Sequence, residues 1–250
     1  MSRQSAKTSP SVQLLKVEGL PAPVEVRRHP TARRLTLRVS RTRRAVYLTV
    51  PRHTDLHEAD RFVARSLAWV RERLDGVPTP IPFRHGTILP LRDVPHELAV
   101  IGPRPGSPVI VVPAASRGDT HQIEIAGPKE HAARRLRDWL IEEAKRDLDM
   151  RVGFHASRLG VRARRLTLRD QKSRWGSCSS SGELSFSWRL ILAPPLVLDY
   201  VAAHEVAHLS EMNHGPRFWR LVEKTMPNFD EARVWLRIRG MDLYRYGADV

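Results

Sequence analysis

Alternating hydrophobic and polar residues predict β-structure near the start of the chain. In RRLTLRV, 33–39, Leu35, Leu37 and Val39 alternate with polar residues, and AVYLTV, 45–50, repeats the pattern. A period of two places the hydrophobic side chains on one face of a strand. Because only a short polar link separates the two segments, we expect a β-hairpin.

Helical spacing of hydrophobic residues follows the hairpin. We expect a helix that is capped by Thr54 or Asp55 and ends at Leu74. Between 77 and 127, proline and glycine separate short hydrophobic runs, which predicts several short strands in a small sheet.

The second half of the chain begins with a strong helical pattern. Pro128 is placed to open a long helix whose hydrophobic stripe runs from Leu136 to Val152, and Gly160 is placed to end it. RRLTLRD, 164–170, then alternates as a strand does.

The segment RWGSCSSSGELSFSWRLILAP, 174–194, predicts a turn at SSSG and then a strand. Alternate hydrophobic residues from Leu184 to Leu190 are expected on one face of that strand and Arg189 on the other. Two prolines end it, and a helix is expected from 195 to about 211, followed by two shorter helices.

These patterns predict an α+β fold in three parts. A flexible tail, 1–22, precedes a β-rich region, 23–127, which also contains helices. The third part, 128–250, contains the longest helical patterns and the candidate chemistry described below.

Composition favours a soluble, cytoplasmic protein. With 41% hydrophobic residues the chain can bury a core. No hydrophobic run approaches the roughly eighteen residues that a membrane span needs, and the N-terminus lacks a secretory pattern. The only cysteine is Cys178, so a disulfide framework is excluded.

The positive charge is uneven along the chain. The net charge is +15, and residues 1–52 hold twelve basic and two acidic residues, or +10 of that total. Such a region can attract nucleic acid or nucleotides. A solvated basic face is the favoured alternative, because no aromatic residues interleave with the charge in the sequence.

The segment HEVAHLSEMNH, 204–214, carries metal-site chemistry. His204 and His208 are four residues apart, so on a helix both imidazoles lie on one face and can bind a single Zn²⁺. Glu205 lies to the side of the first ligand. Its carboxylate is placed to take a proton from a zinc-bound water.

A third ligand is needed, and His214 is the leading candidate. On a continuous helix His214 would point away from His208, so the helix must stop or bend at about 210–213. Asn213 tolerates left-handed backbone, and Gly215 with the following proline favours a break.

Other interpretations of these residues stay open. The histidines could be a buried, hydrogen-bonded pair without a metal, although burying them unpaired is costly. Cys178 could be a nucleophile, but a small packing residue is favoured. Three downstream acids could replace His214 as third ligand: Glu223, Asp230 and Glu231.

The longer segment DQKSRWGSCSSSGELSFSWRLILAPPLVLDYVAAHEVAHLSEMNHGPRFW resembles the YgjP-like metallopeptidase family of zincins. The resemblance extends over roughly residues 25–240, whereas WLM and SprT proteins are similar over the metal helix only. It implies a zincin-like core, with a small sheet, the HExxH helix and an edge strand above a cleft. It also implies one Zn²⁺ per chain, held by His204, His208 and His214, with Glu205 as general base.

The resemblance further implies that RWGSC and the strand after it line the cleft. Trp175, Gly176 and Ser177 are then substrate-binding residues, and Gly176 allows a close backbone approach. A peptide can add to the edge strand through main-chain hydrogen bonds. Arg174 or Arg189 would stabilise developing negative charge, the alternative being surface ion pairs.

The leading functional hypothesis is therefore zinc-dependent hydrolysis of a peptide or protein substrate. A metal-dependent nucleotide pyrophosphatase is an alternative, although the sequence has no Gly-rich phosphate loop and no acidic cluster for Mg²⁺. A nucleic-acid-associated, SprT-like protease is a third possibility. No membrane partner is expected, and the sequence indicates neither the substrate nor the oligomeric state.

Overall fold

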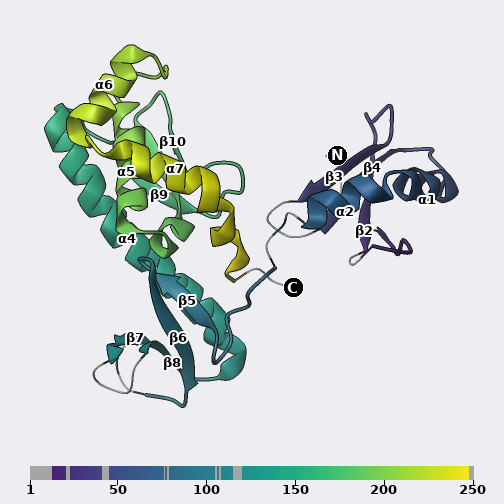
Figure 1. Ribbon diagram of the computed structural model, residues 1–250, viewed down its shortest axis with the longest axis horizontal. Helices are drawn as coiled ribbons and strands as arrows, with labels where there is room; N and C mark the ends of the chain where they lie inside the picture. Colours follow the sequence, from purple (N-terminus) through teal and green to yellow (C-terminus); the bar gives the residue numbers. More distant parts are fainter. Residues whose placement is uncertain are drawn as a thin grey trace, which may run out of the picture. The chain divides into compact units, whose positions relative to one another are not determined.

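The chain forms two compact units in a computed structural model. The units are Met1–Thr79 and Pro80–Val250, and each has its own hydrophobic core. Strands and helices are mixed in both (Figure 1), so the expected α+β class is confirmed. The structure describes residues 13–20, 23–40, 45–75, 77, 79–104, 106, 108–114 and 120–247.

The first unit is a four-stranded sheet with helices on one face. The strand order is β1-β2-β4-β3, with β2 and β4 parallel and the outer pairs antiparallel. Alternate residues Val46, Leu48 and Val50 are buried on the face that forms the core. The elements are β1 Gln13–Leu15, β2 Val24–His29, β3 Thr36–Ser40, β4 Ala45–Pro51, α1 Leu56–Arg65 and α2 Leu67–Asp75.

The hairpin of β3 and β4 is confirmed, and the link at 41–44 lies outside the described residues. The expected single helix is interrupted at Ser66, whose hydroxyl donates to the carbonyl of Phe62 and so competes with helix continuation. Asp55 is the cap, since its side chain accepts from the His57 amide.

The expected flexible tail, 1–22, is in part ordered. Gln13–Leu15 pairs with β2, and Val17 and Leu20 pack against the core of the first unit. The expectation that no aromatic residue interleaves with the basic charge is wrong, since Tyr47 lies between Arg44 and Arg52 in the sequence and pairs with an arginine across the sheet. The Arg27 guanidinium lies 4.6 Å from the ring centroid of Tyr47, and Arg38 pairs with Tyr47 across the sheet.

The second unit is built around the long helix α4. Two sheets flank it, in the orders β5-β6-β8-β7 and β10-β11-β9. The strands are β5 Ile88–Leu91, β6 Val94–Ile101, β7 Val109–Val112, β8 His121–Ala126, β9 Arg165–Arg169, β10 Gly176–Cys178 and β11 Glu183–Ser187. The helices are η1 Lys129–His131, α4 Ala132–Leu159, η2 Trp188–Leu192, α5 Pro195–Ala207, α6 Pro216–Thr225, α7 Phe229–Arg239 and η3 Gly240–Arg245.

Helix α4 follows its predicted stripe. Every fourth residue from Leu136 to Val152 is buried, and Gly160 ends the helix in the left-handed conformation. The β5–β8 sheet packs on this helix (Figure 1), and its residues Leu98 and Ile123 share the same core. The compact unit therefore begins at Pro80, whereas the sequence placed its boundary at 127.

Strand β11 is shorter than expected. It ends at Ser187, whose hydroxyl accepts from the Arg189 amide, and the next five residues form the 3-10 helix η2. All five are buried, so the predicted alternation stops at Ser187. The expectation that Arg189 lies on a polar strand face is therefore wrong.

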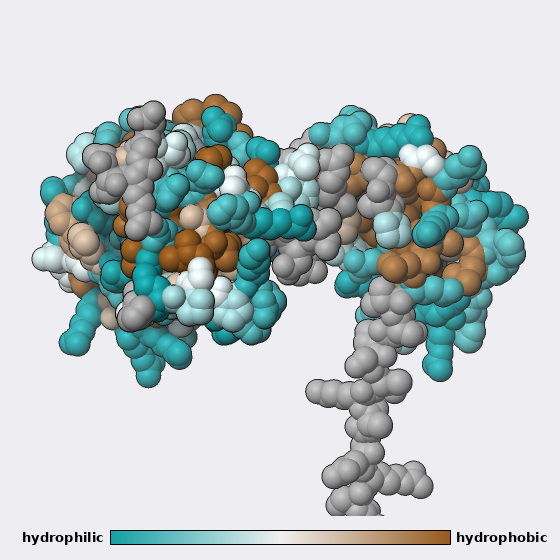
Figure 2. All heavy atoms as spheres, turned by 90° about the horizontal axis from the view of Figure 1, so that it is seen from below, coloured by the Kyte–Doolittle hydropathy of each residue, from teal (hydrophilic) through white to brown (hydrophobic). Residues whose placement is uncertain are grey.

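The surface is mostly hydrophilic, with hydrophobic patches on both units in the view of Figure 2. Within the described residues, no helix has both the length and the hydrophobicity for a membrane crossing.

The packing of α4 predicts a stability change. Replacing the fully buried Leu140 by alanine should lower the unfolding free energy of the second unit by about 2–5 kcal/mol, because a cavity is left in the shared core. Hydrogen exchange of the α4 amides measures this unit by itself. The matched control, Met150→Ala on the same helix at 67% exposure, should change it by less than about 0.5 kcal/mol. Equal effects of the two substitutions would contradict the packing described.

Candidate metal centre

Helix α5 positions the first half of the site. It starts with Pro195 and is buried on nearly all sides, against α4, α6, α7 and β10. Its hydrophobic run explains this burial, and its last turn carries His204, Glu205 and, as the C-terminal cap, His208. The histidine pair therefore sits at the end of a helix that packing holds in place.

A buried polar network fixes α5 against its neighbours. His155 of α4 is fully buried, and its Nε2 and Nδ1 lie 2.7 Å from Asp199 Oδ1 and from Thr225 Oγ1. Burial raises the pKa of Asp199, but hydrogen bonds from His155 and Arg151 outweigh that effect, so its pKa is lowered. These contacts tie α4, α5 and α6 together.

The chain reverses after α5 and returns with His214. The helix ends at Ala207, earlier than expected, and tight turns follow in which the Glu211 amide donates to the Ala207 carbonyl. Helix α6 then starts at Pro216. Asn213 is not left-handed, since Arg92 and Asp93 are the only described non-glycine residues with positive φ. The break was predicted correctly, and Pro216 does begin the next helix, but the left-handed conformation expected at Asn213 is not observed.

The three histidines converge on one point. His214 Nε2 lies 3.0 Å from His204 Nε2 and 3.2 Å from His208 Nε2. One ring nitrogen of each histidine lies within 4.8 Å of the corresponding nitrogens of the other two. His204 is partly buried, His208 buried and His214 exposed, so the site opens toward solvent on the His214 side.

The environment favours the neutral form of His204 and His208. Burial first, and then the neighbouring His208 and His214, lower the pKa of His204 to about 3. Burial also lowers the pKa of His208. The His208 Nδ1 lies 3.0 Å from the Glu211 carbonyl and donates to it, which leaves the Nε2 lone pair facing the other rings.

An aromatic ring packs against His204, His208 and His214, hereafter the triad. The Phe218 ring, which is fully buried, lies 4.8, 4.5 and 4.7 Å from the rings of His204, His208 and His214, centroid to centroid. Phe218 therefore packs against all three imidazoles. The Nδ1 of His204 is buried and has no hydrogen-bond partner among the described residues, so packing alone orients this ring.

The donor set fits a zinc ion. Zinc bonds imidazole nitrogen at about 2.0–2.1 Å, which separates tetrahedral ligands by roughly 3.3 Å, close to the nitrogen spacing in the triad. Neutral imidazoles that point lone pairs at one another repel unless a proton or cation lies between them. Three protein ligands with one open side are typical of catalytic zinc sites.

Glu205 lies directly beneath the backbone of Gly176. A Cβ placed on Gly176 would lie 2.5 Å from Glu205 Oε1 and 2.6 Å from its Cγ, distances that real side chains do not tolerate. Glycine is therefore required here by contact with the glutamate. The sequence predicted a close backbone approach at Gly176, but it did not identify Glu205 as the group approached.

The burial of Glu205 sets its protonation. The side chain is 5% exposed, and burial raises its pKa to about 7, with Arg174 acting in the opposite direction. A carboxyl with a pKa near neutrality can both accept and return a proton. Cys178 lies close by, and burial together with the Glu205 charge raises the pKa of its thiol, which does not favour a nucleophile.

Strand β10 is an edge strand with a free side. The Ser187 amide donates to the Trp175 carbonyl and the Ser179 amide to the Glu183 carbonyl, so odd-numbered residues of this segment bond to β11. The main-chain groups of Gly176 and Cys178 therefore point the other way. Among the described residues, no backbone group pairs with them.

Two of the expected cleft residues have structural contacts. The ring of Trp175 lies 5.0 Å from that of Tyr244 and packs against Gly240. Arg189 is 5% exposed and donates to Asp170 at 2.7 Å and to the carbonyls of Leu243 and Tyr246. Its described partners include neither Glu205 nor the histidines, so the arginine holds η3 in place.

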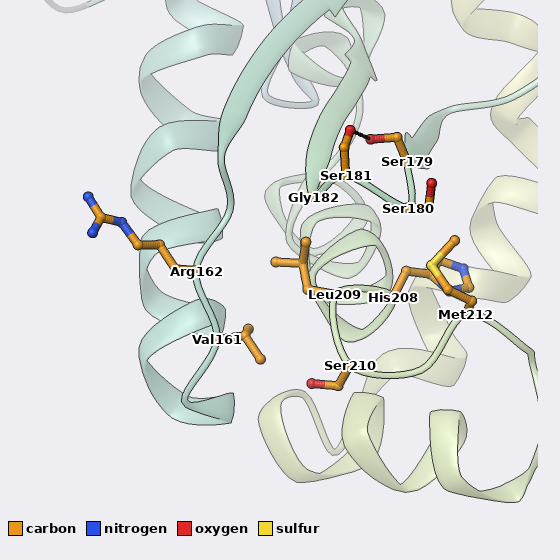
Figure 3. Close-up of a pocket in the computed structure, with 10 residues that line it drawn as sticks. All are labelled: Val161, Arg162, Ser179, Ser180, Ser181, Gly182, His208, Leu209, Ser210 and Met212. Carbon is orange, nitrogen blue, oxygen red and sulfur yellow. Dashed lines mark hydrogen bonds between the residues drawn. The ribbon is translucent and has the colours of Figure 1, made fainter.

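A pocket of about 430 Å³ adjoins His208. Hydroxyls dominate its polar lining, from Ser179, Ser180, Ser181 and Ser210. Ser179 and Ser181 bond to each other at 2.8 Å, and the guanidinium of Arg162 points away from His208 (Figure 3). The pocket provides polar space beside His208.

The alternative third ligands lie elsewhere. The metal-ligand group found within the described residues contains His204, His208 and His214, and no acid joins it. Glu223 and Glu231 are exposed, and Asp230 pairs with Arg233 at 3.1 Å.

Two residues beside the site were missed in the sequence. Gln171 accepts from Arg174 Nε at 2.8 Å and donates to the Ser185 hydroxyl at 2.9 Å. Tyr200 packs its ring 5.8 Å from His204, and burial raises its pKa. Its spacing of four residues before His204 was a signal that could have revealed it.

The family is decided by a match over most of the chain. The family model described as "YgjP-like, metallopeptidase domain" matches residues 33–239, which include both the metal-ligand group and strand β10. The chain belongs to the YgjP-like family. Its resemblance to that family is thereby confirmed, and the family is one of metal-dependent peptidases.

Among solved structures, this YgjP-like chain is similar to the metallopeptidase zymogen of Pyrococcus abyssi abylysin. The two are 22% identical over 37% of this chain and 95% of the other, with a TM-score of 0.34. At that score the similarity supports no inference about this chain. No match was found among curated proteins.

The raised pKa of Glu205 predicts a pH dependence in metal-free protein. A folded-state pKa of about 7, above the ordinary 4.5, stabilises the fold below pH 4.5, and this contribution is lost as pH rises from 4.5 through 7. Glu205→Gln should therefore match the wild type near pH 4 and exceed its unfolding free energy at pH 8 by up to roughly 3 kcal/mol. Urea unfolding of chelator-treated protein at both pH values measures the difference. A difference that stays constant with pH would be the contrary result.

Proposed function

We propose that this protein is a zinc-dependent metallopeptidase that uses Glu205 as general base for peptide-bond hydrolysis. The observation that supports it most is the convergence of three imidazole nitrogens beside a buried carboxyl. Family membership makes peptides or proteins the substrate class.

The site residues would have two roles, metal binding and proton transfer. His204, His208 and His214 would hold one zinc ion through Nε2. A bound zinc ion supplies Lewis acidity, polarising the scissile carbonyl and lowering the pKa of water toward 7. Glu205 accepts the proton of the attacking water and, since its pKa lies near 7, can return a proton to the leaving amine.

The free edge of β10 would position the substrate. A peptide in extended conformation can bond to the outward main-chain groups of Gly176 and Cys178. Because Gly176 lies on Glu205, a peptide on this edge passes close to the base. Ser177 then lies beside the bound peptide on the outer face of the sheet. Trp175, which packs against Tyr244 and Gly240, supports strand β10.

Only one of the two arginines stays a candidate for stabilising negative charge. The charge of Arg174 lowers the pKa of Glu205, so Arg174 is proposed to stabilise negative charge near that carboxyl. Arg189 donates to Asp170 and two carbonyls and has no described contact with the site.

Replacing the base should abolish hydrolysis and leave the metal in place. Glu205→Gln keeps the shape of the side chain but removes its proton-accepting charge, so peptide hydrolysis should fall by about 10²–10⁴-fold. Cleavage of a casein digest, with metal content measured on the same sample, provides the test. Glu223→Gln, on exposed α6 surface, is the matched control and should keep full activity. Wild-type rates in Glu205→Gln would reject the mechanism.

Zinc binding can be tested independently of peptidase activity. Protein purified without added zinc should contain about one zinc per chain by elemental analysis, and His204→Ala should lose it because two ligands remain. His57→Ala, an exposed histidine of the first unit, should keep the wild-type content. Wild-type zinc content in His204→Ala would show that the ion binds elsewhere.

A further inference from the structure

The outer face of the β10-β11-β9 sheet forms a second pocket, of about 380 Å³. Strand register places Thr167 of β9, Ser185 of β11 and Ser177 of β10 side by side on this face. The opposite face carries Leu184 and Phe186, which are buried in the core. The pocket is therefore the polar side of the same sheet whose edge adjoins Glu205.

This pocket has an excess of positive charge. Arg165, Arg169 and Arg174 line it, against one acid, Glu183. Within the described part of the chain, neither Arg165 nor Arg169 takes part in an ion pair or side-chain hydrogen bond. Both residues are exposed, and Arg165 lies beside Glu183 across the two strands, so the pocket keeps a net positive charge whose donors can bind an anion.

The third arginine is held in place. The side-chain amide of Gln171 accepts from Arg174 Nε and donates to the Ser185 hydroxyl. The main-chain carbonyl of Gln171 accepts from the Tyr244 hydroxyl at 2.7 Å. The remaining nitrogens of Arg174 are left for a ligand. A guanidinium fixed by neighbours loses less conformational freedom when it binds an anion.

We propose that this pocket, hereafter the arginine pocket, binds an acidic side chain of the substrate. The inference rests on the proposed function, because it takes its ligand from a peptide on the β10 edge. Successive side chains of such a strand alternate between the two faces of the sheet. Every second one lies on the side of Ser177, which lines the arginine pocket. Aspartate or glutamate there would meet the guanidinium of Arg174 first.

Direct binding tests the pocket without catalysis. Two fluorescein-labelled decapeptides with amidated C-termini are compared, one alternating serine with glutamate and the other serine with glutamine. In strand conformation all acidic side chains then share one face. By fluorescence anisotropy the full chain should bind the glutamate peptide about tenfold more tightly, and 0.5 M salt should reduce the preference.

Matched variants show where the preference arises. Arg165→Gln with Arg169→Gln should bring the two affinities within about twofold. Arg164→Gln with Arg237→Gln removes the same charge from exposed residues outside the pocket and should leave the preference intact. Should the first pair unfold the chain, Arg174→Gln alone should also weaken the preference. Equal binding of the two peptides, or a preference that persists without the pocket arginines, overturns the inference.

Cleavage separates this inference from the proposed function. Zinc-loaded protein is given a peptide library, and the residues flanking each cut are identified. Enrichment of acids at one position, lost in Arg165→Gln with Arg169→Gln, supports both. Cuts without acid enrichment overturn the arginine pocket and leave the peptidase intact, whereas acid-selective binding without any cleavage rejects the peptidase and keeps the pocket.

Discussion

Close contact between strand β10 and the last turn of α5 is the constraint on which the candidate site depends. The backbone of Gly176 rests on the side chain of Glu205, closer than any other residue would allow. That contact removes the carboxyl from water, and the loss of water raises its pKa to about 7. It also brings the open strand edge next to the histidines. One steric fact thus determines where the base lies, how it is protonated and which surface faces it.

The surroundings show why this contact persists. Helix α5 cannot shift easily, since Asp199 is bonded to His155 on α4 and His155 to Thr225 on α6. On the other side, Arg189 joins the sheet segment to η3 through Asp170 and two carbonyls. Of these groups His155 and Arg189 are buried, and both have hydrogen-bond partners, as buried polar groups require. Functional geometry here is maintained by polar bonds between elements as well as by the shared core.

Sequence reasoning was most successful where local geometry decides the outcome. Helical rotation alone places His204 and His208 on one face, and the Gly215–Pro216 pair announces that the helix cannot continue. The hydrophobic stripe of α4 and its end at the left-handed Gly160 were predicted in the same way.

Sequence reasoning failed where tertiary contacts determine the local structure. The side chains of LSFSWRLIL alternate as in a strand, yet the chain turns into η2 after Ser187, and Arg189 is buried with Asp170. Nothing local reveals that Gly176 touches Glu205, or that the β5–β8 sheet shares the core of α4. The assignment of the three histidines as metal ligands stays a prediction.

The shortness of β10 has a consequence for the behaviour of the protein in concentrated solution. An uncovered strand edge is a template on which a second copy can align, and long edges of this kind lead to aggregation. Here the outward main-chain groups come from Gly176 and Cys178 alone. Two residues offer too little pairing to hold another folded molecule, while a flexible guest can gain further contacts beyond the strand. The chain can thus keep an opening for extended polypeptides without inviting its own self-assembly.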